Sequence, residues 1–161
     1  MAGTNIRRRS MLAGGALAAL AWLAAAAGLS RPNPGLAQQW NRAAFEAADM
    51  NEALRALGAA NAVESKAVRF ANPTPEVADN GDAVPIAVAS AIPGTRSIAV
   101  LVEKNPTVLS ARFDIPAGTE AFVSTRIRMG ASSAVVALVG AGGNYYYARK
   151  QIEVEQCGCG A

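Results

Sequence analysis

The sequence predicts an all-β protein, an immunoglobulin-like antiparallel β-sandwich preceded by an N-terminal amphipathic helix and followed by a flexible C-terminal Gly/Cys arm. Three observations predict this fold class. Apolar and polar residues alternate with a period of two from Lys66 onward. Residues with turn chemistry interrupt the alternation repeatedly. The resulting segments, about seven short strands at spacings near ten residues, are typical of an immunoglobulin-like sandwich.

Residues 1–37 have the pattern of an export signal rather than of a folded domain. The arginine run Arg7–Arg9 precedes an uncharged, Ala- and Leu-rich stretch from Leu12 to Leu29, and Ala37 ends a small-residue cleavage motif. Consecutive arginines at this place indicate the twin-arginine route to the periplasm. A membrane anchor is the alternative, because 18 residues is the lower limit for a span. The weak hydrophobicity of Ala and Gly favours a cleaved signal, with no membrane contact after its removal.

The basic character of the chain lies mostly in this signal. The whole chain carries a formal net charge of +3, with 15 basic and 12 acidic residues. Residues 1–37 hold four of the arginines and no acid, which leaves 11 basic against 12 acidic residues in the mature part. No basic stripe with interleaved aromatics remains, so we expect no nucleic-acid partner.

The segment 38–60 is predicted to be the N-terminal helix. Between residues 40 and 57, apolar side chains recur at helical spacing, and Gly58 provides a stop signal. These apolar residues are Ala43, Ala47, Met50, Leu54 and Leu57. The helix either packs on the core of its own domain or presents a contact surface to a partner, since helices often cover the edge of a sheet.

Residues 61–155 are predicted to form the β-domain. Asn105-Pro106 fits a hairpin or a tight corner, and Gly142-Gly143-Asn144 would join the last two strands. The candidate strands are Lys66–Phe70, Ala83–Ser90, Ser97–Glu103, Thr107–Asp114, Ala121–Met129, Ser133–Ala141 and Asn144–Glu155.

The last strand holds three consecutive tyrosines, Tyr145 to Tyr147, which cannot all face one side of a sheet. One or two are therefore expected in the core and the others on the opposite face or an edge. The strand leads into the arm, residues 156–161, in which Gly158 and Gly160 supply backbone freedom.

The absence of histidine limits the chemistry of this chain. It excludes His-based acid–base catalysis and Ser-His or Cys-His nucleophile pairs. The only cysteines, Cys157 and Cys159, do not suffice for a four-ligand zinc site. We therefore expect no enzyme activity, no catalytic residue, no cofactor and no metal site.

The two cysteines stand among glycines at the chain end, where they have no core to join. A thiolate is a strong nucleophile without a dedicated base. The neighbouring Glu153 and Glu155 would raise rather than lower the pKa of these thiols. From Val154, an extended arm reaches Cys159 over at most roughly 17 Å. Such an arm suits insertion into another protein's cleft, so the sequence predicts a carrier whose cargo is bound to sulfur.

Several stretches of the chain, covering nearly all of its mature part, resemble the SoxY family of sulfur carriers. The most specific of them are Val102–Pro106 and Ser124–Gly130. The full set is Trp40–Glu46 with the following helix, Asp79–Gly81 leading into Val84–Val88, Ser97–Pro106, Phe122–Gly130 and the Gly-rich cysteine end.

The resemblance implies an immunoglobulin-like fold and a periplasmic heterodimer with a SoxZ-like β-sandwich subunit. It implies that Cys159 is the site of covalent sulfur attachment during thiosulfate oxidation. The partner enzymes that visit the arm would be SoxAX-like, SoxB-like and SoxCD-like: the first couples thiosulfate to the thiol, the second releases sulfate and the third oxidises the remaining sulfur.

Cys157 departs from the family's Gly-Gly-Cys-Gly-Gly end, because it replaces the first glycine, while Ala161 replaces the last. Three interpretations of Cys157 remain open. It is a bystander, a resolving thiol that discharges Cys159 by forming a disulfide, or one half of a redox or soft-metal tail. The third interpretation carries an alternative function, that of a non-carrier periplasmic binding module whose Cys-Gly-Cys tail binds a soft metal or forms redox-active or intermolecular disulfides.

Two further motifs have a functional and an ordinary interpretation. Glu103–Pro106 is a docking site or, as turn chemistry favours, a strand end and turn. Arg126 and Arg128 either meet an anionic surface or lie on a solvated strand face, which exposed charges do by default.

Overall fold

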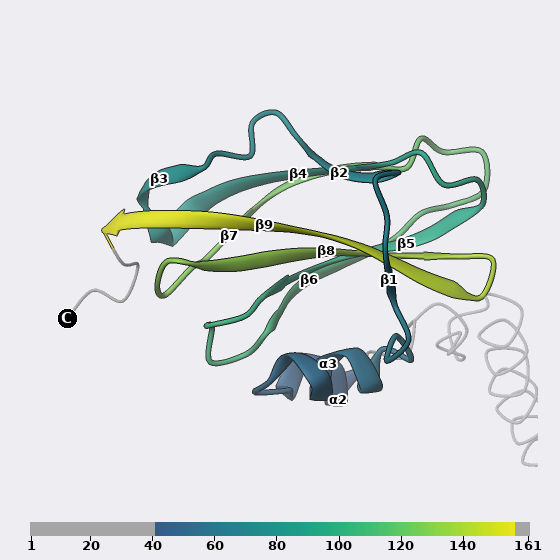
Figure 1. The fold of residues 1–161 in the computed structure, drawn as a ribbon, viewed down its shortest axis with the longest axis horizontal. Coiled ribbons are helices and arrows are strands. Elements are labelled where there is room, and N and C mark those ends of the chain that lie inside the picture. Colours follow the sequence, from purple (N-terminus) through teal and green to yellow (C-terminus); the bar gives the residue numbers. More distant parts are fainter. Residues whose placement is uncertain (1–40, 157–161) are drawn as a thin grey trace, which may run out of the picture. The chain divides into compact units, whose positions relative to one another are not determined.

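The computed structural model describes residues 41–156, which form two β-sheets packed face to face with two short helices on one outer face (Figure 1). The larger sheet has the strand order β1-β9-β8-β5-β6, and β3 also pairs with β9. The smaller sheet has the order β2-β4-β7. The strands are β1 (Val63–Glu64), β2 (Val68–Ala71), β3 (Val77–Asn80), β4 (Val84–Ser90), β5 (Thr95–Val102), β6 (Leu109–Asp114), β7 (Phe122–Ile127), β8 (Ser133–Ala141) and β9 (Asn144–Gln156).

The predicted immunoglobulin-like sandwich is confirmed, and all seven predicted strands are present, β8 with the predicted ends and the others with ends shifted by at most two residues. The sequence prediction missed β1 and β3, which have two and four residues. Both pair with β9 in parallel, whereas every other pairing is antiparallel. Such short strands carry too few residues to show a period of two.

The space between the two sheets is filled by branched aliphatic side chains. Ile98 and Val100 of β5 and Val135 of β8 meet Ile86 and Val88 of β4 in one buried cluster. β8 is buried along almost its whole length, because its other face lies under the helices. A strand buried on both faces has a continuous apolar sequence, and Ala134–Val139 has that sequence.

The predicted N-terminal helical segment is present, but it forms two short helices where one was predicted. The helices are α2 (Arg42–Glu46) and α3 (Met50–Ala56). Asp49 begins α3 by accepting a hydrogen bond from the amide of Glu52 at 2.8 Å, and the Glu52 carboxylate accepts one from Ala48 at 3.2 Å. This reciprocal pair resembles a capping box, which starts a new helix.

The break also changes which residues are buried. Ala43 is exposed, whereas Ala44 and Ala53 are fully buried. Together with Leu57, they pack on Leu101 of β5 and Leu138 of β8. The helices therefore cover the outer face of the larger sheet, on the side away from β2 and β4 (Figure 1). Of the two interpretations, packing on the domain's own core is the one observed.

The three tyrosines of β9 alternate between the two faces of the larger sheet. Tyr146 packs against the sandwich core, and Tyr145 and Tyr147 pack against the helix-covered cluster. β8 and β9 are joined by Gly142 and Gly143, both at positive φ (57° and 84°), as a two-residue type I′ turn requires. β9 therefore begins at this hairpin turn, at one end of the domain, and runs to Gln156 at the other end.

Candidate functional site

The arm predicted to carry the chemistry lies outside the described residues. Cys157, Gly158, Cys159 and Gly160, with Ala161, follow directly after Gln156, the last residue of β9. The roles predicted for these residues therefore remain predictions. The structure does describe the strand from which the arm starts and the residues that hold this strand.

The end of β9 is paired on the side of β3. Ala78 of β3 lies opposite Val154, both buried, and Asn80 lies opposite Gln156. The amide of Glu153 also donates to the carbonyl of Glu76 at 2.9 Å. The strand is therefore held to its last residue. Because the pairing reaches Gln156, the extended distance to Cys159 is about 10 Å rather than the roughly 17 Å predicted from Val154.

On the side facing β8, β9 extends beyond the end of the β8–β9 ladder, and Ser132 provides a further hydrogen bond to it. The last β8–β9 pair is Ser133 with Ile152. Beyond it, the Val154 amide donates to the Oγ of Ser132 at 2.8 Å. A side-chain acceptor thus replaces the missing backbone partner of a buried residue. The sequence prediction did not identify Ser132, since an isolated serine before a strand carries no distinctive signal.

The loop between β5 and β6 braces the same end of the domain. The Asn105 side-chain amide donates to the carbonyl of Arg128 at 2.7 Å, and its oxygen accepts from the amide of Gly130 at 3.0 Å. The amide of Lys104 donates to the buried Oγ of Ser133 at 3.0 Å. The segment Glu103–Pro106 is thus the strand end and turn that turn chemistry favours, and Asn105 connects it to the segment after β7.

Charged side chains around this end form exposed ion pairs. Arg149 of β9 pairs with Glu103 at 2.7 Å, and Arg128 pairs with Asp82 at 3.3 Å. Arg126 is exposed on β7, where it lies opposite Pro85 of β4. Exposed pairs contribute little to stability. Arg126 and Arg128 are both exposed, as the ordinary interpretation of a solvated strand face expects, but only Arg126 lies on β7, because the strand ends at Ile127 before Arg128.

Acidic side chains surround the start of the arm. Glu153 and Glu155 on β9 and Asp79 on the adjoining β3 are all exposed, and none of them forms an ion pair with a described residue. The parallel register places Asp79 beside Glu155. Uncompensated negative charge therefore borders the point at which the chain leaves the sandwich.

The described part of the chain contains no candidate metal centre and no candidate membrane span. Among residues 41–156, no three Cys, Asp or Glu residues are grouped as metal ligands. Within the same range, no helix has the length and apolar character needed to cross a membrane.

The family-model comparison and one solved structure both point to the SoxY family. The family model for the sulfur oxidation protein SoxY matches residues 54–159. The structure resembles that of the sulfur carrier protein SoxY from Chlorobium limicola f thiosulfatophilum, at 33% identity and a TM-score of 0.54, over 62% of this chain and 91% of that chain.

A more distant similarity concerns superoxide reductase (neelaredoxin) from Ignicoccus hospitalis, at 20% identity and a TM-score of 0.48, over 57% of this chain and 82% of that chain. No curated protein matches the sequence. The family match covers more than half of the chain and reaches Cys159, and the structural match has the same sandwich. The chain therefore belongs to the SoxY family of sulfur oxidation proteins.

Proposed function

We propose that this protein is a periplasmic carrier of sulfur intermediates, which it holds covalently on Cys159 during the oxidation of thiosulfate or another reduced sulfur compound. The observation that supports this most directly is the family match, which extends through the C-terminal region to Cys159. The similar structure from Chlorobium is that of a sulfur carrier protein. The export signal predicted over residues 1–37 fits a periplasmic location reached by the twin-arginine route.

The described geometry suits a carrier because the arm starts from a rigid base. β9 is hydrogen-bonded to β8 and β3, and the Oγ of Ser132 holds the amide of Val154 near the end of the strand. Cys159 then follows Gln156 by three residue steps, a reach of about 10 Å when extended. The small side chains around Cys159 minimise the width that must enter a partner's cleft. We therefore place the chemistry in partner enzymes and assign this chain no turnover of its own.

The proposed loading step joins the Cys159 thiol to thiosulfate through a new sulfur–sulfur bond. The reaction removes two electrons and a proton, and the electrons go to a haem-containing, SoxAX-like partner. A SoxB-like hydrolase would then release sulfate, and a SoxCD-like enzyme would oxidise the remaining sulfur. A SoxZ-like subunit is the proposed heterodimer partner. No residue of this chain has to supply a cofactor for these steps.

Mass spectrometry of the C-terminal peptide tests the proposal. Protein is purified from cells grown on thiosulfate, as wild type, Cys159→Ser and Cys157→Ser. We expect a reductant-sensitive sulfur or thiosulfonate adduct on the wild type and on Cys157→Ser but none on Cys159→Ser. If no adduct forms on any variant while thiosulfate is being oxidised, the carrier function is wrong.

The same variants separate the alternative function. A soft-metal tail predicts tight copper(I) binding by the wild type that a double Cys→Ser variant loses. Copper(I) binding without any sulfur adduct would favour the binding module over the carrier.

A further inference from the structure

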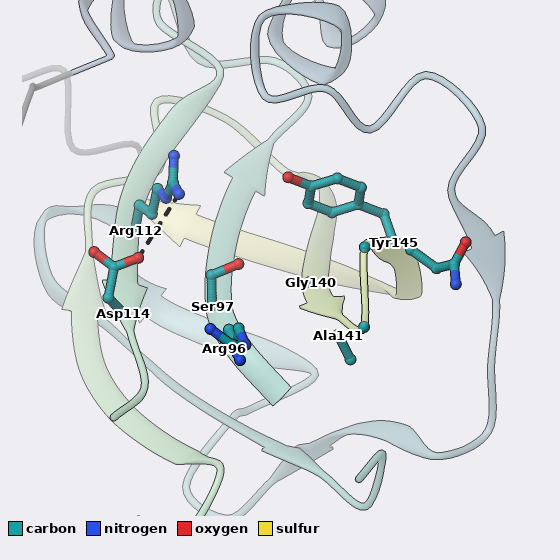
Figure 2. A pocket seen from close by; sticks show the side chains of 10 residues that line it. Arg96, Ser97, Arg112, Asp114, Gly140, Ala141 and Tyr145 are labelled. Carbon is teal, nitrogen blue, oxygen red and sulfur yellow. Dashed lines mark ion pairs between the residues drawn. The ribbon is translucent and has the colours of Figure 1, made fainter. Parts of the chain in front are cut away.

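A hollow of about 250 Å³ lies at the end of the domain where β9 begins (Figure 2). It is bordered by the β5 start, the end of β6 and the β8–β9 hairpin turn. β9 separates it from the arm by twelve residue steps, or about 40 Å. The residues that matter to its chemistry are Arg96, Ser97, Arg112, Asp114, Gly142 and Gly143.

A β-bulge directs Arg96 to this hollow. Thr95 lies opposite Ala141 and Ser97 lies opposite Gly140, so Arg96 is an additional residue on β5. In a regular strand, position 96 would share the face of Ile98, which is fully buried in the sandwich core. The bulge instead leaves Arg96 exposed and lining the hollow. Bulges that redirect a side chain are common beside functional sites.

The positive charge of the hollow is only partly compensated. Arg112 of β6 pairs with Asp114 at 3.7 Å, near the limit for an ion pair. The backbone carbonyl of Arg96 accepts a hydrogen bond from the amide of Ile115 at 2.8 Å, but its guanidinium forms no hydrogen bond or ion pair with any residue in the described range 41–156. Figure 2 shows Arg96, Ser97 and Arg112 gathered at one side of the hollow. One guanidinium is therefore available to an anion.

The hairpin contributes space and backbone donors. A Cβ on Gly140 would lie 2.6 Å from the Oγ of Ser97, so the wall beside the hydroxyl has no room for a side chain. Gly142 and Gly143 have open space where a Cβ would be. Their amides donate to no backbone acceptor in the described part of the chain. Successive free amides in a turn form an anion-binding concavity.

We propose that this hollow binds a small oxyanion of the size and charge of sulfate or thiosulfate. Guanidinium groups bind such oxyanions through paired, charge-assisted hydrogen bonds, and a hydroxyl and turn amides satisfy the remaining oxygens. The volume is below the roughly 300 Å³ at which pockets for drug-sized ligands begin, which favours a small ion. Asp114 opposes an anion electrostatically, so the affinity is weak.

The site assignment is independent of the cysteine arm and of the proposed function. Thiosulfate alone among the test ions is chosen because of the proposed carrier function. A chain that carries no sulfur on Cys159 would still bind sulfate in the hollow, and a carrier with an empty hollow would still be loaded.

Titration followed by ¹H–¹⁵N NMR tests the proposal on the mature protein. Sodium sulfate, thiosulfate, acetate or chloride is added at constant ionic strength. We expect saturable shifts at Gly142 and Gly143 and at the Nε of Arg96 with sulfate and thiosulfate. Shifts that stay linear with sulfate, or that saturate equally with chloride or acetate, would overturn the assignment.

Three variants make the test specific. Arg96→Gln is expected to weaken sulfate binding about tenfold, because it removes the available guanidinium. Asp114→Asn is expected to tighten binding about fivefold, the effect of removing one like charge close to the ion. Arg126→Gln, an exposed arginine on the other sheet, is the matched control and leaves binding unchanged. If Arg96→Gln and Arg126→Gln weakened sulfate binding equally, the loss would be explained by the change in net charge alone, and the proposal would be overturned.

Discussion

The backbone amide of Val154 donates a hydrogen bond to the Oγ of Ser132 at 2.8 Å, two residues after the β8–β9 ladder has ended. This bond lies two residues before Gln156, where the described chain ends. It joins the end of β9, from which the arm starts, to the segment between β7 and β8.

Replacing Ser132 with Ala removes this bond and leaves the amide of a buried residue without a partner. We expect a loss of about 1 kcal/mol in the free energy of unfolding, or about 4 °C in Tm. Amide exchange at Val154 and Glu155 is expected to accelerate more than exchange in the centre of β8. Ser124→Ala, at an exposed position on β7, is the control. Unchanged exchange at Val154 would contradict the role given to Ser132.

Asn105 connects two loops with both groups of its side-chain amide. Asn105→Ala loses both hydrogen bonds, and we expect it to lower the free energy of unfolding by about 1–3 kcal/mol, measured by urea denaturation. Asn105→Asp keeps the acceptor for Gly130 but loses the donor to the carbonyl of Arg128. We therefore expect the free energy of unfolding of Asn105→Asp to lie between those of the wild type and Asn105→Ala. Equal free energies of unfolding for these three proteins would show that Asn105 does not stabilise the contact between the two loops.

Gly140 faces Ser97 across the β5–β8 ladder, and a Cβ at Gly140 would lie 2.6 Å from the Ser97 Oγ. Gly140→Ala is expected to cost about 1–3 kcal/mol through overpacking. Adding Ser97→Ala removes the nearest clashing atom and is expected to recover most of this loss. The Tyr145 ring, at 3.1 Å, has to shift only slightly. A double variant as unstable as Gly140→Ala would exclude the contact as the cause.

The ion pair between Arg149 and Glu103 is short, at 2.7 Å, but both side chains are about half exposed. Water and salt screen such pairs, so Arg149→Gln is expected to change the free energy of unfolding by less than about 1 kcal/mol. Denaturation at low and high salt measures the effect, which is expected to shrink as salt is added. A larger, salt-independent loss would show that the Arg149 side chain stabilises the sheet by packing.

Cys157→Ser is expected to leave the loading of Cys159 and the lifetime of its adduct unchanged. A disulfide between Cys157 and Cys159 would close a small, strained ring, which disfavours its formation. Intact mass over time after loading measures this. Two observations together would instead identify Cys157 as a resolving thiol. The adduct would last longer in Cys157→Ser, and the unloaded wild-type peptide would be lighter by two hydrogens than the free dithiol form.

Much of the fold could be predicted from the sequence, because its strands are long enough to show their period. β8 was predicted with the observed ends, Ser133 and Ala141, and the glycine turn that follows it requires positive φ. The two helices were predicted as one because apolar residues recur at helical spacing across the break between them. The break depends on the Asp49–Glu52 capping pair, a local signal within that helical pattern.

Less of the site could be predicted. The cysteines stand out because the chain has no others, but their surroundings depend on contacts between distant segments. Ser132 contacts Val154 across 22 residues, and Asn105 contacts Gly130 across 25. Arg96 is one exposed arginine among many until the register of β5 on β8 shows that it occupies a bulge. Such relationships arise from strand register, which a single sequence does not reveal.

The pairing of β9 also determines how the protein responds to traction. In the proposed function, a partner that withdraws while still attached to Cys159 would load the C-terminal end of β9, and a pull along the strand acts perpendicular to the hydrogen bonds of its ladders. In this direction the bonds share the load rather than open one after another. The strand between β8 and β3 would therefore act as a tether that withstands repeated docking and release without peeling from the sheet.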